Sequence, residues 1–376
     1  MIRFVDVHHM SDWIAATGLD EVLLGLVAAL EDDFRRWESF DKTPRVASHS
    51  EHGVIELMPA SDGVVYGFKC VNGHPINSTR GLSTVTAFGA LSDVDTGYPI
   101  LLSEMTLLTA LRTAATSAMV AKQLAPADAR TMALIGTGAQ SEFQAAAFRA
   151  VLGIETLRVW DVDAAAMAKF ERNATAMGFD VTVCSGAEDA ITGADVVTTC
   201  TADKRNATIV TDDMVRRTES SRRHGLHVNA IGGDCPGKTE LDIELVKRST
   251  IFVEYPDQSF VEGEIQFLPR DWPVTEFWKV LTGAAPGRIG DEITVFDSVG
   301  FAVEDVCALR HLDESIRGTS FFTELDLVAE PADPKDLFGA YVAGRTTVRS
   351  GACEATGTDA AGPFADSRRL HPVAGA

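Results

Sequence analysis

The feature that most constrains the fold is a glycine-rich turn between an apolar strand and a helix. The apolar run 131–135 is followed by the hexapeptide GTGAQS at residues 136–141, where a helix is expected to begin. This order matches the G-x-G-x-x-G/A turn of dinucleotide-binding βαβ units, with Ser141 at the third small position. Gly136 permits the tight turn, and Gly138 lets the backbone approach a pyrophosphate that the helix N-terminus attracts. The turn therefore predicts a dinucleotide-binding unit of the Rossmann type.

An acidic residue after the next strand favours NAD over NADP as the dinucleotide. The second strand, 157–160, ends beside Asp161. A carboxylate at this position accepts a hydrogen bond from the ribose 2′-hydroxyl and repels a 2′-phosphate. Asp163 is a second acid nearby, and we expect it to cap the following helix. A glycine turn alone is also compatible with an ordinary loop; the order of strand, turn, helix, strand and acid favours the nucleotide site.

Two patterns of secondary structure divide the chain. Between residues 126 and 316, continuous apolar runs alternate with helical stretches, as in a parallel sheet covered on both faces. Residues 1–125 instead combine a helix at 19–30 with strand-like runs separated by turns. We predict an α/β fold in which a Rossmann-type NAD-binding domain at 126–316 follows an α+β domain at 1–125. Residues 351–376 are poor in large apolar side chains and are expected to be disordered.

Charge and cysteine content narrow the classes of partner. The 376 residues include 54 Asp and Glu against 33 Lys and Arg, a formal net charge of −21. This excess argues against a nucleic-acid binder or a binder of anionic membranes, both of which need clustered basic residues. The six cysteines are scattered without metal-binding spacing, so no metal site is expected. Neither a signal peptide nor a membrane-spanning apolar run is apparent, which favours a reduced, cytoplasmic setting.

Three charged residues occupy apolar surroundings, where an unpaired charge is costly. Strand alternation puts Lys69 and Glu56 on the apolar faces of the runs 65–71 and 54–58. Arg112 lies among Leu and Ala in a predicted helix, where its guanidinium can fork onto a substrate carboxylate. The alternatives are an edge strand with a solvated face for Lys69 and Glu56, and a surface position for Arg112. The residues alone leave both interpretations open.

Asp234 is a candidate acid/base. It follows the strand 227–231 through Gly232 and Gly233, at the edge where open α/β sheets bind their ligands. A carboxylate there is well placed to face the nicotinamide ring of the dinucleotide. The alternative is an ordinary aspartate in a turn.

Residues 1–320 resemble the ornithine cyclodeaminase/mu-crystallin family, which also includes some alanine dehydrogenases. The segments that carry the resemblance are TPRVASH, GVIELMP, YGFKCVNGHP, RGLSTV, ALRTAATSA, ALIGTGAQSEFQ, TADKRNATI, NAIGGDCPGKTEL, VTEFWKV, LTGAAPGR and VFDSVGFAVED. Of these, DCPGKTEL is similar to the cyclodeaminase branch. The chain departs from the family pattern in Arg216–Gly225, which we interpret as a solvated loop insertion, and in the C-terminal tail.

The resemblance implies a role for each site residue. Arg45, Lys69 and Arg112 would hold the substrate carboxylate, and Val299 would touch the substrate. Glu56 and Asp234 would face the side-chain amine, with Asp234 as the main acid/base. The NAD site would comprise Thr84, Arg112, Gly136, Gly138, Ala139, Gln140, Asp161, Thr201, Val228, Asn229, Ala230, Ile231, Lys238 and Ser298. The N-terminal domain would bind substrate and form a homodimer, and a helical return around 317–345 would rejoin it.

The implied reaction converts L-ornithine to L-proline and ammonia, with hydride transferred to NAD and back. The catalytic residues would be Asp234, Glu56 and Lys69. Three alternatives stay open: a lysine cyclodeaminase, a ketimine reductase or amino-acid dehydrogenase of the same family, and a non-enzymatic, crystallin-like NAD-binding protein. Ornithine and lysine differ by one methylene, which is worth only ~1–3 kcal/mol of discrimination.

Overall fold

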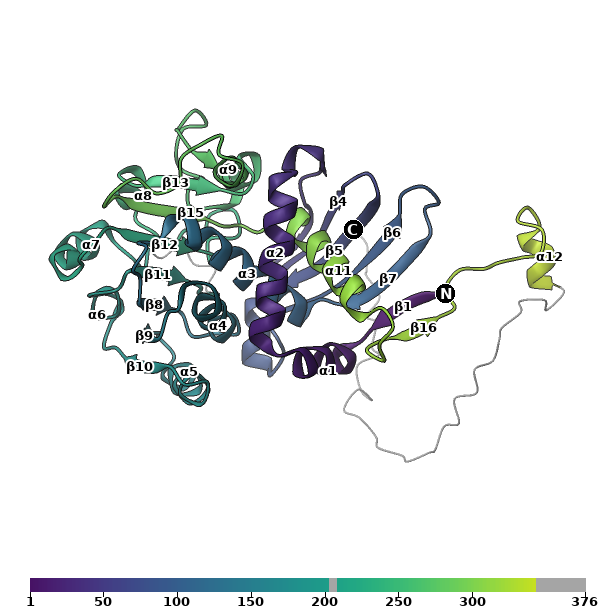
Figure 1. Ribbon diagram of the computed structural model, residues 1–376, viewed down its shortest axis with the longest axis horizontal. Coiled ribbons are helices and arrows are strands. Elements are labelled where there is room, and N and C mark those ends of the chain that lie inside the picture. Colours follow the sequence, from purple (N-terminus) through teal and green to yellow (C-terminus); the bar gives the residue numbers. More distant parts are fainter. Residues whose placement is uncertain (203–207, 343–376) are drawn as a thin grey trace, which may run out of the picture. The chain divides into compact units, whose positions relative to one another are not determined.

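The computed structural model describes residues 1–202 and 208–342, and chain contacts divide it into two compact units (Figure 1). The first unit, Met1–Leu325, holds both β-sheets of the described chain. The second unit, Asp326–Ala376, includes the helix α12 (Leu337–Val342). The predicted disorder of residues 351–376 falls outside the described residues.

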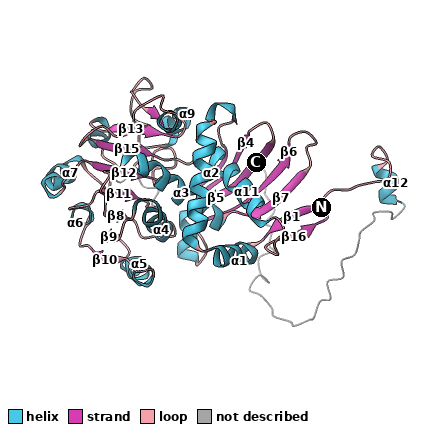
Figure 2. Ribbon diagram, viewed as in Figure 1, coloured by secondary structure: helices cyan, strands magenta, loops and turns pink. Residues whose placement is uncertain are grey.

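The first sheet is mixed and is built mainly from the N-terminal third of the chain (Figure 2). In spatial order its strands are β16 (Thr323–Leu325), β1 (Ile2–Val5), β7 (Pro99–Glu104), β6 (Val85–Asp93), β5 (Val65–Gly73), β4 (Gly53–Ser61) and β2 (Asp41–Lys42), with β3 (Val46–Ser50) also paired to β4. Neighbours are antiparallel except β1 and β7. The hairpins follow from short turns such as the one at Gly63, whose φ of 84° suits glycine.

Helices cover the inner face of the first sheet. α2 (Leu19–Arg35) and α11 (Ala302–Ile316) pack against each other, and α11 also contacts β4, β5 and β6. α2 buries an apolar stripe at helical spacing that comprises Val22, Leu23, Leu26, Val27, Leu30 and Phe34. α1 (Val7–Thr17) begins at Asp6, whose carboxylate accepts from two backbone N–H groups. No single helix of the described residues is long and apolar enough to span a membrane. Only α1 and α2 taken together reach that length and composition, and the chain bends by 99° between them.

The second sheet is parallel throughout. Its order is β10 (Asp180–Val183), β9 (Thr156–Trp160), β8 (Thr131–Ile135), β11 (Val196–Thr199), β12 (Leu226–Ala230), β15 (Ile293–Asp297), β13 (Thr250–Val253) and β14 (Thr275–Glu276). The intervening helices are α4 (Ser141–Leu152), α5 (Ala164–Ala176), α6 (Ala187–Ile191), α7 (Asp212–Thr218), α8 (Ile243–Lys247), α9 (Pro256–Glu262) and α10 (Phe277–Leu281). The 3-10 turn η3 (Glu219–Ser221) follows α7, whereas η1 (Trp37–Ser39) and η2 (Pro75–Arg80) lie among the strands of the first sheet.

Both faces of the parallel sheet are buried. Along β8, Met132 and Leu134 belong to the large core that also contains side chains of α2, α3 (Thr106–Leu124) and α11, whereas Ala133 and Ile135 belong to a second core beneath the opposite face. Alternate side chains of a strand point to opposite faces, so continuous apolar strands imply helices on both sides. The predicted α/β class with a Rossmann-type sheet is confirmed.

The connection between the sheets is α3 (Thr106–Leu124), which ends at the predicted domain boundary near residue 125. Contacts join both sheets into one unit, so a division at that point stays a prediction. Within 317–345, where a helical return was expected, the chain forms strand β16 and then, in the second unit, helix α12; β16 pairs with the edge of β1, whose backbone groups would otherwise lack partners. The expected loop insertion at 216–225 contains the end of α7 and the turn η3.

Candidate active site

The glycine turn has the geometry that a pyrophosphate needs. Gly136 has a φ of +100°, and a Cβ there would lie 2.8 Å from the carbonyl oxygen of Cys200. A Cβ on Gly138 would meet nothing within 4 Å, so the backbone of this residue borders open space. The Ser141 hydroxyl donates to the Gly138 carbonyl at 2.8 Å and holds the turn at the start of α4. These features fit a bound dinucleotide phosphate.

Asp161 connects the end of β9 to the glycine turn. Its carboxylate accepts from the Thr137 backbone N–H at 2.6 Å and from the Thr137 hydroxyl at 3.1 Å. Asp163 accepts from the N–H groups of Ala165 and Ala166, which confirms the predicted cap of α5. The acid thus lies beside the phosphate turn, where a ribose hydroxyl of the dinucleotide would lie.

Lys238 contacts the loop after β11, which neighbours β8 on the side away from β9 and Asp161. Its ammonium donates to the carbonyl of Thr201 at 2.6 Å and lies 3.9 Å from a carboxylate oxygen of Asp234. The Lys238 side chain is buried, whereas the Asp234 side chain is 53% exposed. Asp234 therefore retains access to solvent and to a small molecule while a cation stands near it.

Three buried acids fasten the loop that carries Asp234, and we call them the carboxylate ladder: Glu240, Glu264 and Asp297. Asp297 accepts from the N–H groups of Glu264 (2.9 Å) and Ile265 (3.2 Å). Glu264 accepts from the N–H groups of Glu240 (2.8 Å) and Leu241 (2.9 Å), and Glu240 accepts from the N–H of Thr201 (2.9 Å). The ladder thus runs from β15 to the loop at Thr201.

The pKa values of the ladder acids follow from burial. Burial raises the pKa of Asp297 to about 7, although hydrogen bonds from two backbone N–H groups oppose the shift. Burial, with the nearby Asp297 and Glu240, also raises the pKa of Glu264 well above its usual range. These acids retain protons at pH values where a surface carboxylate has lost them.

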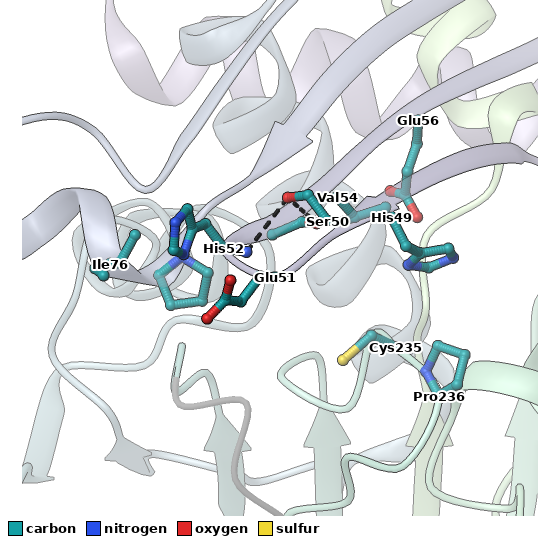
Figure 3. Close-up of a pocket in the computed structure, with 11 residues that line it drawn as sticks. His49, Ser50, Glu51, His52, Val54, Glu56, Ile76, Cys235 and Pro236 are labelled. Carbon is teal, nitrogen blue, oxygen red and sulfur yellow. Dashed lines mark hydrogen bonds between the residues drawn. The ribbon is translucent and has the colours of Figure 1, made fainter. Parts of the chain in front are cut away.

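A cavity of about 490 Å³ lies between the β3–β4 hairpin and the Asp234 loop. Figure 3 shows His49 and Glu56 on the hairpin side and Cys235 and Pro236 on the loop side. Register explains the hairpin side: Glu56 pairs with Ala47 and Val54 pairs with His49, so these four residues share one face of the first sheet. The first sheet and the second sheet each supply one wall of this cavity.

Arg45 joins the β3–β4 hairpin to the residues just before α11. Its guanidinium donates to Glu56 at 3.2 Å and to the carbonyls of Val299 (2.8 Å) and Gly300 (2.7 Å), and it pairs with Glu262 at 3.2 Å. All of these groups are at least half-buried. Arg45 and Glu56 therefore lie side by side, one able to meet a carboxylate and the other an amine.

Lys69 and Arg112 share one counter-charge. The Lys69 ammonium donates to Asp305 Oδ1 at 2.8 Å, and Arg112 Nε donates to the same oxygen at 2.9 Å, while Arg112 Nη1 donates to Glu304 at 2.6 Å. Lys69 is 2% exposed. Burial, with the Arg112 charge, lowers the pKa of Lys69 to about 8, and Asp305 opposes the shift. The solvated-edge alternative for Lys69 is wrong.

The remaining predicted residues occupy four places. Thr84 precedes β6, and its carbonyl accepts from the backbone N–H of His74. Ser298 follows β15 and donates to Glu254 at 2.6 Å; burial raises the pKa of Glu254. Gln140 and Ala139 precede α4, and the residues of β12 and its end are Val228, Asn229, Ala230 and Ile231. The Asn229 side chain turns into the core, where its amide donates to Gln144 and Thr198.

Several charged residues of the site were not predicted from the sequence: Glu240, Glu254, Glu262, Glu264, Asp297, Glu304 and Asp305. The rule that identified Asp234, a polar residue at the carboxyl end of a parallel strand, applies equally to Glu254 and Asp297. For Asp305, the only signal is an acidic pair in the first turn of a predicted helix, which usually serves the helix dipole.

Known proteins resemble this chain over nearly its whole described length. The Ornithine cyclodeaminase/mu-crystallin family model matches residues 7–320. Ornithine cyclodeaminases of Brucella suis and Agrobacterium fabrum are each 57% identical over 340 residues, covering 90% of this chain and 93% and 94% of theirs. A solved lysine cyclodeaminase, studied for recognition of L-lysine, L-ornithine and L-2,4-diaminobutyric acid, gives a TM-score of 0.82 at 32% identity, covering 90% of this chain and 98% of its own. A solved archaeal alanine dehydrogenase dimer with bound NAD gives a TM-score of 0.77 at 30% identity. The match covers 87% of this chain and 99% of the dehydrogenase chain. The chain belongs to the ornithine cyclodeaminase/mu-crystallin family.

Proposed function

We propose that this chain is an ornithine cyclodeaminase that converts L-ornithine to L-proline and ammonia with NAD as a catalytic cofactor. The observation that carries the proposal is the 57% identity to ornithine cyclodeaminases over 90% of the chain. The site supports it, because cations suited to a carboxylate (Arg45, Lys69, Arg112) and acids suited to an amine (Glu56, Asp234) come from both sheets to one region.

NAD fits the edge of the parallel sheet. The residues that would hold it are Gly136, Gly138, Ala139 and Gln140 at the phosphates, Asp161 at the ribose, and Thr84, Arg112, Thr201, Val228, Asn229, Ala230, Ile231, Lys238 and Ser298 along the rest of the site. Two observations support such a ligand: a Cβ on Gly138 would meet nothing within 4 Å, and the N-cap side chain of α4, Gln140, makes no capping hydrogen bond to the helix. The chemistry supplied by bound NAD is hydride transfer from the substrate Cα and back, without net oxidation.

Substrate binding depends on the charged residues of the first sheet and its helices. Arg45, Lys69 and Arg112 hold the α-carboxylate, and Val299 packs against the carbon chain. Glu56 neutralises the side-chain ammonium from the hairpin wall. Because the pKa of Lys69 is about 8, its ammonium is charged at neutral pH and able to donate to the carboxylate.

Asp234 moves the protons. Its half-exposed carboxylate takes a proton from the δ-ammonium group, so that the neutral amine attacks the oxidised Cα within the same molecule. The same carboxyl then gives its proton to the departing amine, and ammonia leaves. The Lys238 ammonium lies 3.9 Å from Asp234 Oδ1, so a cation stands beside the carboxylate that exchanges these protons.

The direct test is to incubate the purified protein with L-ornithine and NAD⁺ and to identify the products. Proline and ammonia without accumulation of NADH are expected; stoichiometric NADH would instead identify a dehydrogenase, and the absence of any reaction would favour a crystallin-like binding protein. The substitution Asp234→Asn is expected to abolish turnover while NAD still binds. Near wild-type activity in that variant would disprove the role of Asp234.

Lysine is the second candidate substrate, because the solved lysine cyclodeaminase is similar over 90% of this chain. An added methylene changes binding by only ~1–3 kcal/mol, so competition between the two amino acids is the relevant measurement. We expect proline to dominate over the six-membered product, pipecolate, when ornithine and lysine are supplied together. Pipecolate as the main product would reassign the substrate.

We also infer a homodimer formed through the first sheet, and a cytoplasmic setting. The outer face of that sheet exposes large apolar side chains that single folded chains usually bury: Val46, Ile55, Leu57, Tyr66 and Phe88. A second copy of the chain is the partner favoured by the family, in which the similar alanine dehydrogenase is a dimer. On this proposal residues 1–125 bind substrate and dimerise, and 126–316 bind NAD.

A further inference from the structure

The carboxylate of Asp305 joins two cations that come from distant parts of the chain. Lys69 lies on β5 and Arg112 on α3, yet both donate to the single oxygen Oδ1, at 2.8 and 2.9 Å. Asp305 itself is fully buried in the first turn of α11. This single oxygen therefore holds the Lys69 ammonium and the Arg112 guanidinium close together, although the two residues are far apart in the sequence.

The surroundings of Arg112 leave its guanidinium little freedom. Nη1 donates to Glu304 at 2.6 Å, and the backbone of Gly300 approaches so closely that a Cβ there would lie 3.0 Å from Nη1. The Gly300 φ of 70° is one that glycine adopts easily. The start of α11 thus encloses Arg112 and presents Asp305 to its Nε.

We propose that Asp305 is a positioning residue that aligns Lys69 and Arg112 as one receptor for the α-carboxylate of the amino-acid substrate. Asp305 does not contact the substrate; it acts through the two cations. The inference rests on the proposed function, in which these cations hold that carboxylate. Its chemical basis is that a carboxylate binds most tightly to donors already fixed in position.

Electrostatics explain why this place requires an anion. The charged groups that face Lys69 are Arg112 from α3, Arg45 from the chain before β3, and Asp305 and Glu304 from α11. Burial raises the pKa of Glu304, although the Arg112 charge opposes the shift. Asp305 is the carboxylate that accepts hydrogen bonds from both Lys69 and Arg112, so it favours the charged form of Lys69 and offsets the repulsion between the neighbouring cations.

The test is the isosteric substitution Asp305→Asn in the full chain loaded with NAD⁺. Three quantities are measured against pH: the KM for L-ornithine, and the dissociation constants of L-ornithine and of L-proline by calorimetry. We expect KM and both dissociation constants to rise at least about tenfold near neutral pH, the loss of one charge-assisted contact. In the wild type, amino-acid binding weakens at the pH where Lys69 loses its proton. In Asp305→Asn this pH is expected to be lower, because Lys69 has lost the carboxylate that favours its charged form. The NAD dissociation constant is expected to change less than the amino-acid constants, because Arg112 is the one proposed cofactor residue with a hydrogen bond to Asp305 among the described residues.

Asp313 provides a matched control on the same helix. It is also buried, and it pairs with Arg3 and Arg317 instead of with the site. Asp313→Asn is expected to lower the melting temperature without changing the pH dependence of amino-acid binding. If Asp305→Asn behaves like Asp313→Asn, or loses NAD binding together with amino-acid binding, the positioning role is wrong.

The binding data separate this inference from the proposed function. If the wild-type protein makes no proline, the cyclodeaminase assignment fails, yet weaker amino-acid binding by Asp305→Asn still supports the role of Asp305. If the wild type makes proline and Asp305→Asn binds amino acids normally at every pH, only the inference fails. A wild-type protein that binds neither amino acid overturns both.

Discussion

At the scale of single residues, the carboxylate of Asp161 lies where cofactor preference is decided. It already accepts two hydrogen bonds from Thr137 and so has a fixed orientation. Asp161→Ser is expected to reduce the preference for NAD over NADP about tenfold, since it removes an acceptor for the ribose and a charge that repels a 2′-phosphate. The measurement is the ratio of kcat/KM values for the two cofactors.

Asp163 supplies the control for that substitution. Asp163→Ser keeps a side chain able to cap α5 and lies two residues away, so the cofactor ratio is expected to stay unchanged. Equal ratios in the wild type and Asp161→Ser would contradict the ribose role.

The buried carboxyl of Asp297 predicts how stability depends on pH. Its pKa is near 3.8 in the unfolded chain and about 7 in the folded one, so between these values only the folded state holds the proton. The resulting stabilisation is present below about pH 4 and is lost as the pH rises through about 7. The loss is on the order of 2–4 kcal/mol. Asp297→Asn is expected to flatten this fall, as measured by urea unfolding at pH 5 and pH 8. Parallel pH curves for the two proteins would contradict the assignment.

The sequence predicted which residues of a strand share a face of the sheet, but not which charged residues they contact on that face. Alternation correctly places Lys69 and Glu56 on the covered face of the first sheet, where each is paired with another charge. Asp305 is 236 positions from Lys69, and no local pattern specifies such a pairing. Only the packing of α11 on β5 brings the two together.

At the scale of elements, the loop after β12 is held by the carboxylate ladder. Gly233 lies so close to Glu264 that a Cβ would overlap its Oε1, which explains a glycine at this position without any unusual φ. Gly233→Ala is therefore expected to displace the loop and Asp234 with it, and to lower kcat about tenfold or more. Steady-state kinetics with ornithine test this.

Gly186 offers a matched control for the added methyl group. A Cβ there would meet nothing within 4 Å, and its φ of −172° is ordinary extended backbone. Gly186→Ala is expected to leave kcat and the melting temperature close to those of the wild type. A Gly233→Ala protein that shares this behaviour would show that the ladder does not set the position of the loop.

Elements with a local signature were the most predictable ones. The strand before the glycine turn was predicted as 131–135 and is β8 over those residues, because apolar composition and the turn define both ends. The return of the chain at 317–345 was expected to be helical; the segment that pairs with the first sheet is the strand β16, and the helix α12 follows it. Its pairing with β1 joins residues more than 300 positions apart, so the free edge of the sheet decides the structure and local propensity does not.

At the scale of the whole molecule, net charge and apolar surface lead to different expectations. A formal charge of −21 keeps chains apart in solution, yet the outer face of the first sheet is apolar. On that face Leu57 of β4 stands opposite Cys70 of β5, which stands opposite Phe88 of β6, so neighbouring strands form a continuous row. Among the described residues of the first unit, the packed helices α2 and α11 cover only the other face (Figure 1). Burial of this row against a second copy would remove apolar area from water at about 25 cal/mol per Å².

Phe88 is the residue at which to test the dimer, because it is 51% exposed and lies at the β6 end of that row. Phe88→Glu introduces a charge that a symmetric interface would have to bury twice, so we expect monomers in size-exclusion chromatography with light scattering. Phe267→Glu is the matched control: Phe267 is 59% exposed but follows α9, away from the first sheet, and its substitution is expected to leave the dimer intact. A dimer that persists in Phe88→Glu, or a wild-type monomer, would show that the outer face of the first sheet has another role.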